Sequence, residues 1–506
     1  SSEYQKRFSA KLSLKDLFLN TDIESHAYLI EKSKHVTFDS IEPIATAESY
    51  AISDAQRRLW VLSQFEQGKS AYNMPFSLPL HGVSNLDHFK KAIAAAVNRH
   101  EILRTIFKED ANGEVRQWVL SAEDLNYEIK EIDLREESNL NGKIETYIQD
   151  DLYRSFDLEN GPLFRMTFLQ TGAEDYIFYY NMHHIISDGW SMNVLRDDVL
   201  TYYKAFEQGV EASLPVLPIQ YKDYAAWQLT ALENGTYESH KAYWLNQLSG
   251  ELPVLDLPSN QTRPVVKTYE GHNLSINLPV DLTQKLKNFS QENGGSLFMG
   301  ILTTWNILLS RYSGQKDLVL GTPVAGRDHA DLNKQIGFYV NTLALRNQVN
   351  SEEGFKACFN RIKETTLTAY EHQHYPFDRL VEELDLKRDT SRNPLFDIML
   401  TLQNVMEGES QIYDEVGQVI DNGSSVAKFD MNITAQEAGD HLSIYINFNS
   451  AVYEKELISQ LMVDYKTLVS NLLANPSEKI GQINLLSDSA MEHQLVTLNQ
   501  TAQAYP

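Results

Sequence analysis

Residues 176–191, YIFYYNMHHIISDGWS, contain a strand-like segment, a turn and the start of a helix, and they decide which fold class the sequence predicts. The aromatic-rich first half predicts a β-strand. Ser-Asp-Gly then predicts a turn. Apolar residues recur at helical spacing from Trp190 up to Gly209, where the helix is expected to stop. A strand that runs through a tight turn into a helix indicates a fold of mixed α/β layers.

The segments on either side of this stretch repeat the mixture of helix and strand. Residues 87–107 and 297–314 carry apolar residues at helical spacing, and the second is apolar enough for a buried helix. Residues 317–326 and 441–453 predict strands. Prolines within 212–264 interrupt the regular periodicity. We therefore expect two mixed lobes of about 200 residues each.

The composition limits the class of protein. The 506 residues are 42% hydrophobic and 22% charged. No apolar run approaches the roughly 18 residues that a membrane span needs. The net charge of −25 repels polyphosphate backbones. The first residues lack the basic start and the apolar stretch of a secretory signal. We expect a globular, cytoplasmic protein that binds neither membranes nor nucleic acids.

Covalent catalysis has little support in this sequence. No Gly-x-Ser-x-Gly stretch occurs, so the strained serine of a hydrolase elbow is missing. Cys358 is the only cysteine and cannot form an internal disulfide. Its helical spacing predicts a small core side chain instead.

The two adjacent histidines cannot act together. Neighbouring side chains on a strand point to opposite faces, so only one of His183 and His184 can face a cavity. With Asp188 they form a poor metal site, because no third histidine or cysteine lies nearby. What remains is a neutral imidazole that accepts a proton from, or orients, a nucleophile carried by a substrate. Asp188 would either bond the histidine or hold the loop through a buried arginine. A plain Asp-Gly turn after two core histidines is the alternative.

The histidine stretch and six others match one family in the same order. The sequence resembles the condensation domains of nonribosomal peptide synthetases, whose motif His-His-x-x-x-Asp-Gly corresponds to residues 183–189. The resemblance covers about residues 47–485. The six other stretches are SDAQRRLWVL from Ser53, RHEILRTIF from Arg99, YKDYAAW from Tyr221, IGFYVNTLALR from Ile336, HQHYPFDRLV from His372 and RDTSRNPLFDIML from Arg388.

The flanking segments add to this resemblance. Residues 1–31 read as two short helical pieces and resemble the C-terminal part of a peptidyl carrier domain, without the Gly-Gly-x-Ser stretch that carries phosphopantetheine in that family. Residues 32–46 predict an extended linker. Residues 486–506 resemble the linker toward an adenylation domain. The body then divides into an N-terminal lobe at 47–225 and a C-terminal lobe at 226–485.

The resemblance also implies a fold and a reaction. It implies two chloramphenicol-acetyltransferase-like lobes arranged as a V-shaped pseudodimer, with the active site in a tunnel at their junction. It implies an acyltransferase of antibiotic biosynthesis and secondary metabolism that forms a peptide bond. In that reaction the amine of an aminoacyl thioester on a downstream carrier attacks the thioester of an upstream carrier. The domain itself binds no cofactor, because the partner carriers deliver the phosphopantetheine arms. A carrier directly upstream suggests an L-configured donor.

Roles for individual residues follow from the same resemblance. His184 is the catalytic histidine and His183 its structural neighbour, while Gly189 lets the backbone approach the substrate. Asp188 pairs with an arginine, for which Arg327 is the first candidate and Arg346 the second. Arg58 and Arg104 are expected to brace the first lobe. The remaining motif residues, expected to be structural or to line the tunnel, are Trp190, Tyr221, Asp223, Trp227, Asn341, Arg388 and Asn393.

Several alternatives remain. His372, His374 and Asp378 could be read as metal ligands, although Pro376 favours a packed loop. Epimerization domains share the histidine motif but are usually not followed by such a tail, and heterocyclization domains have aspartate where His183 stands. A catalytically silent docking module that only recruits a carrier is the alternative from a different class.

Overall fold

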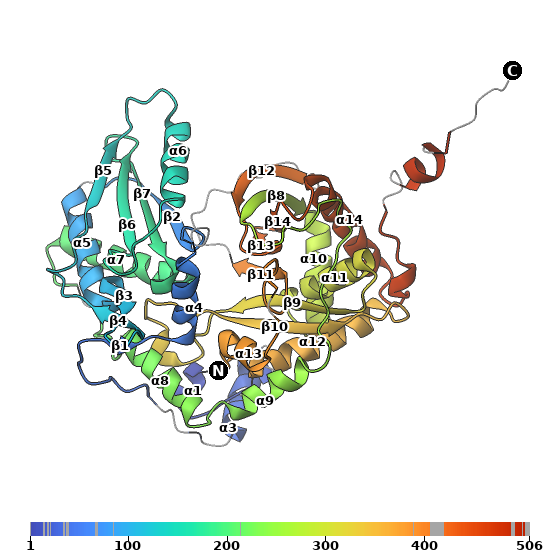
Figure 1. Cartoon of the computed structure of the whole chain (residues 1–506), viewed down its shortest axis with the longest axis horizontal. Helices are drawn as coiled ribbons and strands as arrows, with labels where there is room; N and C mark the ends of the chain where they lie inside the picture. Colours follow the sequence, from blue (N-terminus) through green and yellow to red (C-terminus); the bar gives the residue numbers. More distant parts are fainter. Residues whose placement is uncertain are drawn as a thin grey trace.

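The computed structural model arranges the chain as two lobes that form a V, open at the top of Figure 1. The helices α1 (Ser2–Phe8) and α3 (Ile23–Lys32) lie at the closed end of the V, near the N-terminus. The structure describes residues 2–13, 16–17, 20, 22–33, 36, 40–65, 69–83, 85–212, 214–387, 389–404, 419–486, 491–497 and 499–500.

Two sheets form the first lobe. One has the strand order β2-β7-β6-β5 and the other β1-β4-β3. Only β5 and β6 pair in parallel, and the other neighbours are antiparallel. The strands are β1 (Tyr50–Ala51), β2 (Asn73–Leu80), β3 (Thr105–Glu109), β4 (Val115–Val119), β5 (Ile129–Asp133), β6 (Phe164–Gln170) and β7 (Tyr176–His183).

The helices of this lobe pack on the four-stranded sheet and around its end. Phe89 of α5 contacts Phe168 of β6 and Phe178 of β7 edge-on or tilted. As the sequence predicts, α7 stops at Gly209, which has a left-handed φ of 66°. The helices are α4 (Asp54–Ser63), α5 (Leu86–Arg99), α6 (Leu140–Leu152), α7 (Gly189–Gln208) and α8 (Tyr221–Glu233).

One helical expectation was too long. Within residues 87–107 the α-helix ends at Arg99, a 3-10 turn η2 (Glu101–Arg104) follows, and β3 begins at Thr105. His100 has an extended backbone, and its ring bonds Asp198 of α7 at 2.8 Å. The β-branched residues that follow then favour a strand. A tertiary contact therefore overrides the helical spacing.

A single seven-stranded sheet forms the second lobe, in the order β10-β9-β11-β13-β14-β8-β12. β11 pairs in parallel with both β9 and β13. The strands are β8 (Glu270–Leu278), β9 (Asp317–Val324), β10 (Asn341–Gln348), β11 (Ile398–Asn404), β12 (Val419–Val426), β13 (Met431–Ala438) and β14 (His441–Asn449). The helices are α9 (Glu238–Gln247), α10 (Val280–Glu292), α11 (Leu297–Ser313), α12 (Phe355–Glu371), α13 (Phe377–Glu383) and α14 (Lys455–Ala474).

Two sequence expectations concern the core of this lobe, and both are confirmed. Residues 297–309 of α11 are all buried, so the helix runs through the core. Cys358 is fully buried on α12, and burial raises the pKa of its thiol to about 12. A thiol that stays protonated at neutral pH is a packing group and not a nucleophile.

Each lobe has its own hydrophobic core. The first core contains buried residues from Ile41 to Ala225, and the second contains residues from Ala231 to Ile483. The change occurs within α8, so the boundary expected at 225/226 falls inside a helix. Leu332, Ile336 and Tyr339 of the β9–β10 loop belong to the first core. A loop of the second lobe therefore crosses over to the first.

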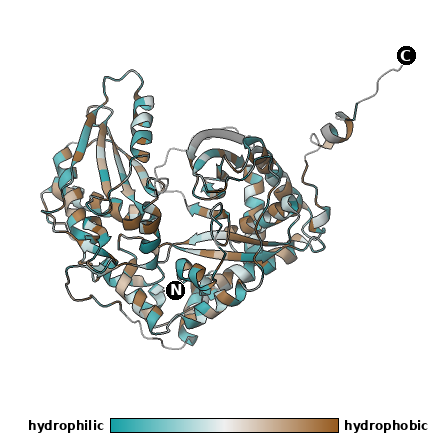
Figure 2. Cartoon of the chain, in the orientation of Figure 1, coloured by the Kyte–Doolittle hydropathy of each residue, from teal (hydrophilic) through white to brown (hydrophobic). Residues whose placement is uncertain are grey.

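Hydrophobic and hydrophilic residues are mixed along the helices and strands of both lobes (Figure 2). This amphipathic pattern lets most elements turn one face to a core and another to water, while α11 runs through the core. Of the helices in the described part of the chain, none combines the length and the apolar character that crossing a bilayer requires.

Candidate active site

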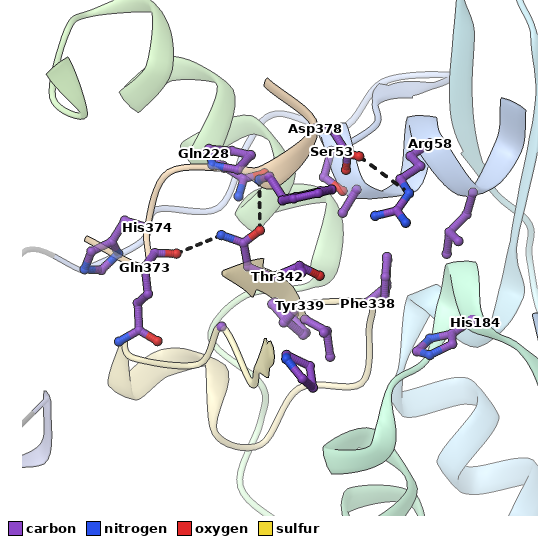
Figure 3. A pocket seen from close by; sticks show the side chains of 18 of the residues that line it. Ser53, Arg58, His184, Gln228, Phe338, Tyr339, Thr342, Gln373, His374 and Asp378 are labelled. Atoms are coloured by element: carbon purple, nitrogen blue, oxygen red, sulfur yellow. Dashed lines mark hydrogen bonds and ion pairs between the residues drawn. The ribbon is translucent and has the colours of Figure 1, made fainter. Parts of the chain in front are cut away.

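A cavity that is open to solvent lies where the lobes meet (Figure 3). His184 lies near one side of the view in Figure 3, and His374 lies near the other. The lining comes from both lobes and includes Ser53, Arg58, Tyr72, His184, Tyr224, Trp227, Gln228, Tyr237, Asp328, Phe338, Asn341, His374, Asp378 and Lys428.

The end of β7 positions His184. The strand stops at His183, and a 3-10 turn, η3 (His184–Ile186), begins. The backbone N–H of His184 donates to the carbonyl of Tyr72 at 2.9 Å. Its ring Nδ1 lies 2.7 Å from the carbonyl oxygen of Ser187. A carbonyl can only accept, so Nδ1 carries the proton and Nε2 keeps a free lone pair.

The surroundings keep this imidazole neutral. Burial, and secondarily the positive charge of Lys428, lowers the pKa of His184 to about 4. Phe338 packs against the ring in a T-shaped arrangement, with 4.8 Å between the centroids. At physiological pH the ring is therefore a hydrogen-bond or proton acceptor next to the cavity.

His183 lies away from the cavity. Its side chain is buried, and its Nδ1 accepts the backbone N–H of Ile185 at 3.1 Å. Phe156 packs edge-on to the ring at 6.1 Å. Burial lowers the pKa of His183 to about 3. The predicted divergence of the two histidines is confirmed, because only His184 lines the cavity.

Asp188 holds the turn and does not bond to His184. It is the N-cap of α7, and its Oδ1 accepts the backbone N–H of Ser191 at 2.8 Å. Its Oδ2 accepts the N–H of Tyr339 at 3.1 Å. The Nη2 of Arg327 donates to both carboxylate oxygens, at 3.0 and 3.2 Å. The two charged side chains are each only 1% exposed.

Arg327, and not Arg346, is thus the partner of Asp188. Arg327 also donates to the carbonyls of Leu332 and Gln335, each at 2.7 Å, which fixes the β9–β10 loop around the pair. Arg346 instead pairs with Asp317 at 2.7 Å, on the neighbouring strand. The Asp188–Arg327 pair joins the histidine turn of the first lobe to a loop of the second.

A substitution at Gly326 tests whether the β9–β10 loop must keep its backbone conformation to hold Arg327. Its φ is 63°, and a Cβ there would lie 1.9 Å from the carbonyl oxygen of Tyr339. We expect Gly326→Ala to displace Arg327 and lower the free energy of unfolding by about 3 kcal/mol, measured by urea denaturation.

Gly189→Ala is the matched control for that substitution. It adds a Cβ at the first residue of α7 with no atom within 4 Å, so the stability should be unchanged or slightly higher. Equal stability of Gly326→Ala and the wild type would show that the loop tolerates the shift. Loss of activity in a stable Gly189→Ala variant would support the predicted approach of substrate to this backbone.

Two charged pairs join α4 to α13 across the lobes. Arg58 lies 3.6 Å from Asp378, and Arg379 donates to Asp54 at 3.1 Å (Figure 3 shows the first pair). The expectation that Arg58 braces the first lobe was wrong, because its partner is in the second lobe and its side chain lines the cavity. The sequence could not show this, since α13 follows more than 300 residues later.

Asp378 is an unusual carboxyl group within this contact. Burial raises its pKa to about 6, although the nearby Arg58 opposes the shift. Because the pKa is close to neutrality, its charge changes within the physiological range. The Arg58–Asp378 contact is therefore weaker at pH 5 than at pH 8.

The other motif residues mostly support the backbone. Arg104 donates to the carbonyls of Val97 and Leu120, so it braces the first lobe as expected. Asn341 donates to the carbonyls of Gln373 and Tyr375 and accepts the N–H of Phe377. Trp190 is 46% exposed, and its indole donates to the carbonyl of Asn333. Arg388 lies outside the described residues.

The remaining motif residues lie around the junction. Tyr221 donates to the carbonyl of Phe338, which ties α8 to the crossing loop. Asp223 caps the start of α8 by accepting the N–H of Gln220 at 2.6 Å. Trp227 lines the cavity. The side-chain oxygen of Asn393 accepts a hydrogen bond from the ammonium of Lys267 at 2.6 Å, within the second lobe.

The histidines of residues 372–378 do not converge as metal ligands. The Nδ1 of His374 pairs with Asp328 at 3.0 Å, while the Nδ1 of His372 lies 3.0 Å from that of His240. Asp378 pairs with Arg58 instead. No cluster suited to a metal ion occurs among the described residues.

Sequence reasoning did not single out three residues next to His184, although Phe338 lies within the matched stretch from Ile336. Tyr72 and Phe338 contact it directly, and Lys428 acts on it electrostatically. They come from three distant parts of the chain, and none lies at a spacing that relates it to residues 183–189. Only the packing of the two lobes brings them together.

The sequence of this chain has relatives among known proteins. A family model described as "Condensation domain" matches residues 46–495. Tyrocidine synthase 3 of Brevibacillus parabrevis is 37% identical over 506 residues, covering 100% of this chain and 8% of that protein. Gramicidin S synthase 2 of Aneurinibacillus migulanus is 35% identical over 510 residues, covering 100% of this chain and 11% of that protein. The chain thus spans only about a tenth of the length of these relatives.

The fold has solved counterparts. The condensation domain from the monacolin K polyketide synthase superimposes with a TM-score of 0.73 at 20% sequence identity. The match covers 87% of this chain and 100% of that one. At this identity the likeness concerns the fold, which is the expected pair of chloramphenicol-acetyltransferase-like lobes.

Proposed function

Because this chain belongs to the condensation-domain family, we propose that it forms a peptide bond between two substrates held as thioesters on carrier domains. The acceptor amine attacks the thioester carbonyl of the donor, so that a C–N bond forms and the C–S bond breaks. The donor's phosphopantetheine thiolate leaves and takes up the proton that the amine loses. The reaction is an acyl transfer and consumes no further reactant.

The observation that supports this proposal best is the state of His184. Its Nδ1 is committed to the carbonyl of Ser187, and its neutral Nε2 is left as an acceptor. An amine has to lose a proton as it becomes an amide, and an acceptor of this kind either takes that proton or orients the amine. Residues of both lobes line the cavity, and holding both reactants there would supply proximity.

The proposed partners are an upstream carrier, a downstream carrier and an adjoining adenylation domain, with phosphopantetheine arms supplied by the carriers. Residues 1–31 are assigned to the end of the upstream carrier, and Lys6 of α1 pairs with Asp331 of the crossing loop at 2.9 Å. We assign residues 32–46 and 486–506 to linkers and the lobes to 47–225 and 226–485. A cytoplasmic location is proposed with this assignment.

Intact-protein mass spectrometry tests the reaction. A carrier loaded with a labelled aminoacyl donor is mixed with a loaded acceptor carrier and this protein. We expect the acceptor to gain the donor's mass only when the protein is present. No gain with several amino-acid pairs, while carrier binding persists, would replace this proposal with a docking module.

The donor is proposed to have the L configuration. We expect an L-aminoacyl donor carrier to react about 10-fold faster or more than the same carrier loaded with the D enantiomer. The measurement compares initial rates for the two enantiomers of one amino acid with one acceptor. Equal rates, or a faster D donor, would contradict the assignment.

A further inference from the structure

Lys428 places a positive charge in the same cavity as His184. It lies between β12 and β13, half-buried, with its ammonium 4.7 Å from the centre of the Tyr72 ring. The carbonyl of that same Tyr72 accepts the backbone N–H of His184. One tyrosine thus contacts the histidine through its backbone and the lysine through its ring.

The backbone around Lys428 is held firmly. Its carbonyl accepts the ammonium of Lys267, which also donates to Asn393 at 2.6 Å. The preceding residue, Ala427, donates its N–H to the carbonyl of Tyr269 at 3.0 Å. The side chain therefore starts from a fixed point and reaches toward the cavity.

The ammonium of Lys428 has no anionic partner among the described residues. Its contact there is the face of Tyr72, and Arg58, the other cation nearby, is paired with Asp378. An ammonium has three N–H donors, and leaving them unused in a half-buried site is costly. Burial accordingly lowers the pKa of Lys428 to about 8, with a further contribution from Arg58. The site lacks an acceptor that a bound reactant can supply.

We propose that the ammonium of Lys428 binds the negative oxygen of the tetrahedral intermediate formed on the donor thioester. This inference rests on the proposed function. When the acceptor nitrogen bonds to the carbonyl carbon, the π electrons of the C=O bond move to oxygen, and Lys428 donates a hydrogen bond to that oxyanion. The electrons return when the C–S bond breaks, and the proton lost by the nitrogen ends on the sulfur. Lys428 keeps its own proton throughout.

A fixed cation is well suited to this step. Donors aimed at an oxygen that becomes charged only during the reaction stabilise the intermediate more than the bound substrate. His184 acts on the nitrogen and Lys428 on the oxygen, so the two residues act on different atoms bonded to the same carbon. A cation that has no anionic partner in the described part of the chain also raises the affinity of the cavity for anions in general.

The first test compares Lys428→Met, Lys428→Arg and the exposed control Lys285→Met. Methionine keeps much of the side-chain volume without the charge, so we expect kcat for peptide formation to fall about 100-fold or more. Arginine should retain most of the rate, and Lys285→Met should equal the wild type. An unchanged kcat in Lys428→Met would overturn the proposal.

The pH dependence separates this role from an effect exerted through His184. Tyr72 contacts Lys428 through its ring, and the ionisable groups that interact with it electrostatically are Arg58, His183 and His184. If Lys428 acted only by lowering the pKa of His184, the decrease in kcat caused by Lys428→Met would disappear at higher pH, where the imidazole is neutral in any case. We expect the loss to persist from pH 6 to 8. The ratio of wild-type to Lys428→Arg rates should then fall above pH 8, as the lysine loses its charge and the arginine keeps it.

A binding measurement distinguishes this proposal from the function on which it rests. The probes are a pantetheine-linked phosphonate, which is tetrahedral and anionic, and a neutral pantetheine-linked amide. By calorimetry, Lys428→Met should bind the phosphonate at least 10-fold more weakly and the amide equally well. Equal phosphonate affinity would overturn the anion site. A Lys428-dependent affinity in a protein that makes no peptide would overturn the function and leave the anion site standing.

Discussion

His184→Ala should lower the rate of peptide formation by about 100- to 10,000-fold, the range typical for loss of a proton acceptor. The substitution removes the free Nε2 and leaves the Asp188–Arg327 pair in place. Since His184 begins the turn after β7 and is not part of either hydrophobic core, the protein should remain folded. Intact-mass analysis of the acceptor carrier measures the rate, and circular dichroism checks the fold.

His374→Ala is the matched control for this variant. It removes a histidine that lines the same cavity but is paired with Asp328. We expect its rate to stay within about 10-fold of the wild type, because no proton acceptor for the amine is lost. Near-normal turnover by a folded His184→Ala variant would contradict the assignment of His184 as the residue that accepts the proton or orients the amine.

The pH profile gives an independent check on His184. Its folded pKa of about 4 lies below the ordinary value of 6.5, so the imidazole stays neutral until the solution is strongly acidic. The kcat of the wild type should therefore not fall with the histidine-like pKa near 6.5 on acidification. On acidification, His184 takes up a proton in the unfolded protein at a higher pH than in the folded protein. The free energy of unfolding therefore decreases as the pH falls from about 6.5 toward 4.

Asp188→Ala should destabilise the protein by about 3–5 kcal/mol, because it leaves the buried guanidinium of Arg327 without its counter-charge. It also removes the N-cap of α7 and the acceptor for the N–H of Tyr339. Urea denaturation measures the effect on stability, and peptide formation should be lost in parallel because the turn after His184 is no longer held.

The pair Asp317–Arg346 provides the control for the destabilisation expected from Asp188→Ala. Its side chains are 27% and 18% exposed, and it links two strands of the same lobe. Asp317→Ala should cost about 1 kcal/mol or less and leave the catalytic turn intact. A similar cost for both aspartates would contradict the special role of the buried pair.

Local features of the site could be predicted from the sequence. The strand before His183 and the helix up to Gly209 follow from residue type and spacing, and they force the two histidines apart. The burial of Cys358 follows from its position on an amphipathic helix. Each of these depends on neighbours within a few turns of chain.

Contacts between the lobes could not be predicted in the same way. The choice between Arg327 and Arg346 depends on which loop crosses to the first core, and both arginines follow similar strand patterns. Arg58 was expected to brace its own lobe, and for the same reason the sequence did not show that its partner, Asp378, lies in the second lobe. Lys428 has no local pattern at all, because its role comes from Tyr72 beneath it and from the lack of a counter-charge among the residues that the structure describes.

The charged pairs between the lobes also determine how such enzymes can be recombined. A crossover placed within α8 joins the first lobe of one parent to the second lobe of another. In such a hybrid, each of three ion pairs has one residue from each parent: Asp188–Arg327, Asp54–Arg379 and Arg58–Asp378. A hybrid of this kind keeps its histidine turn only if both parents supply matching charges. Exchanging the whole of residues 46–495 transfers all three pairs together.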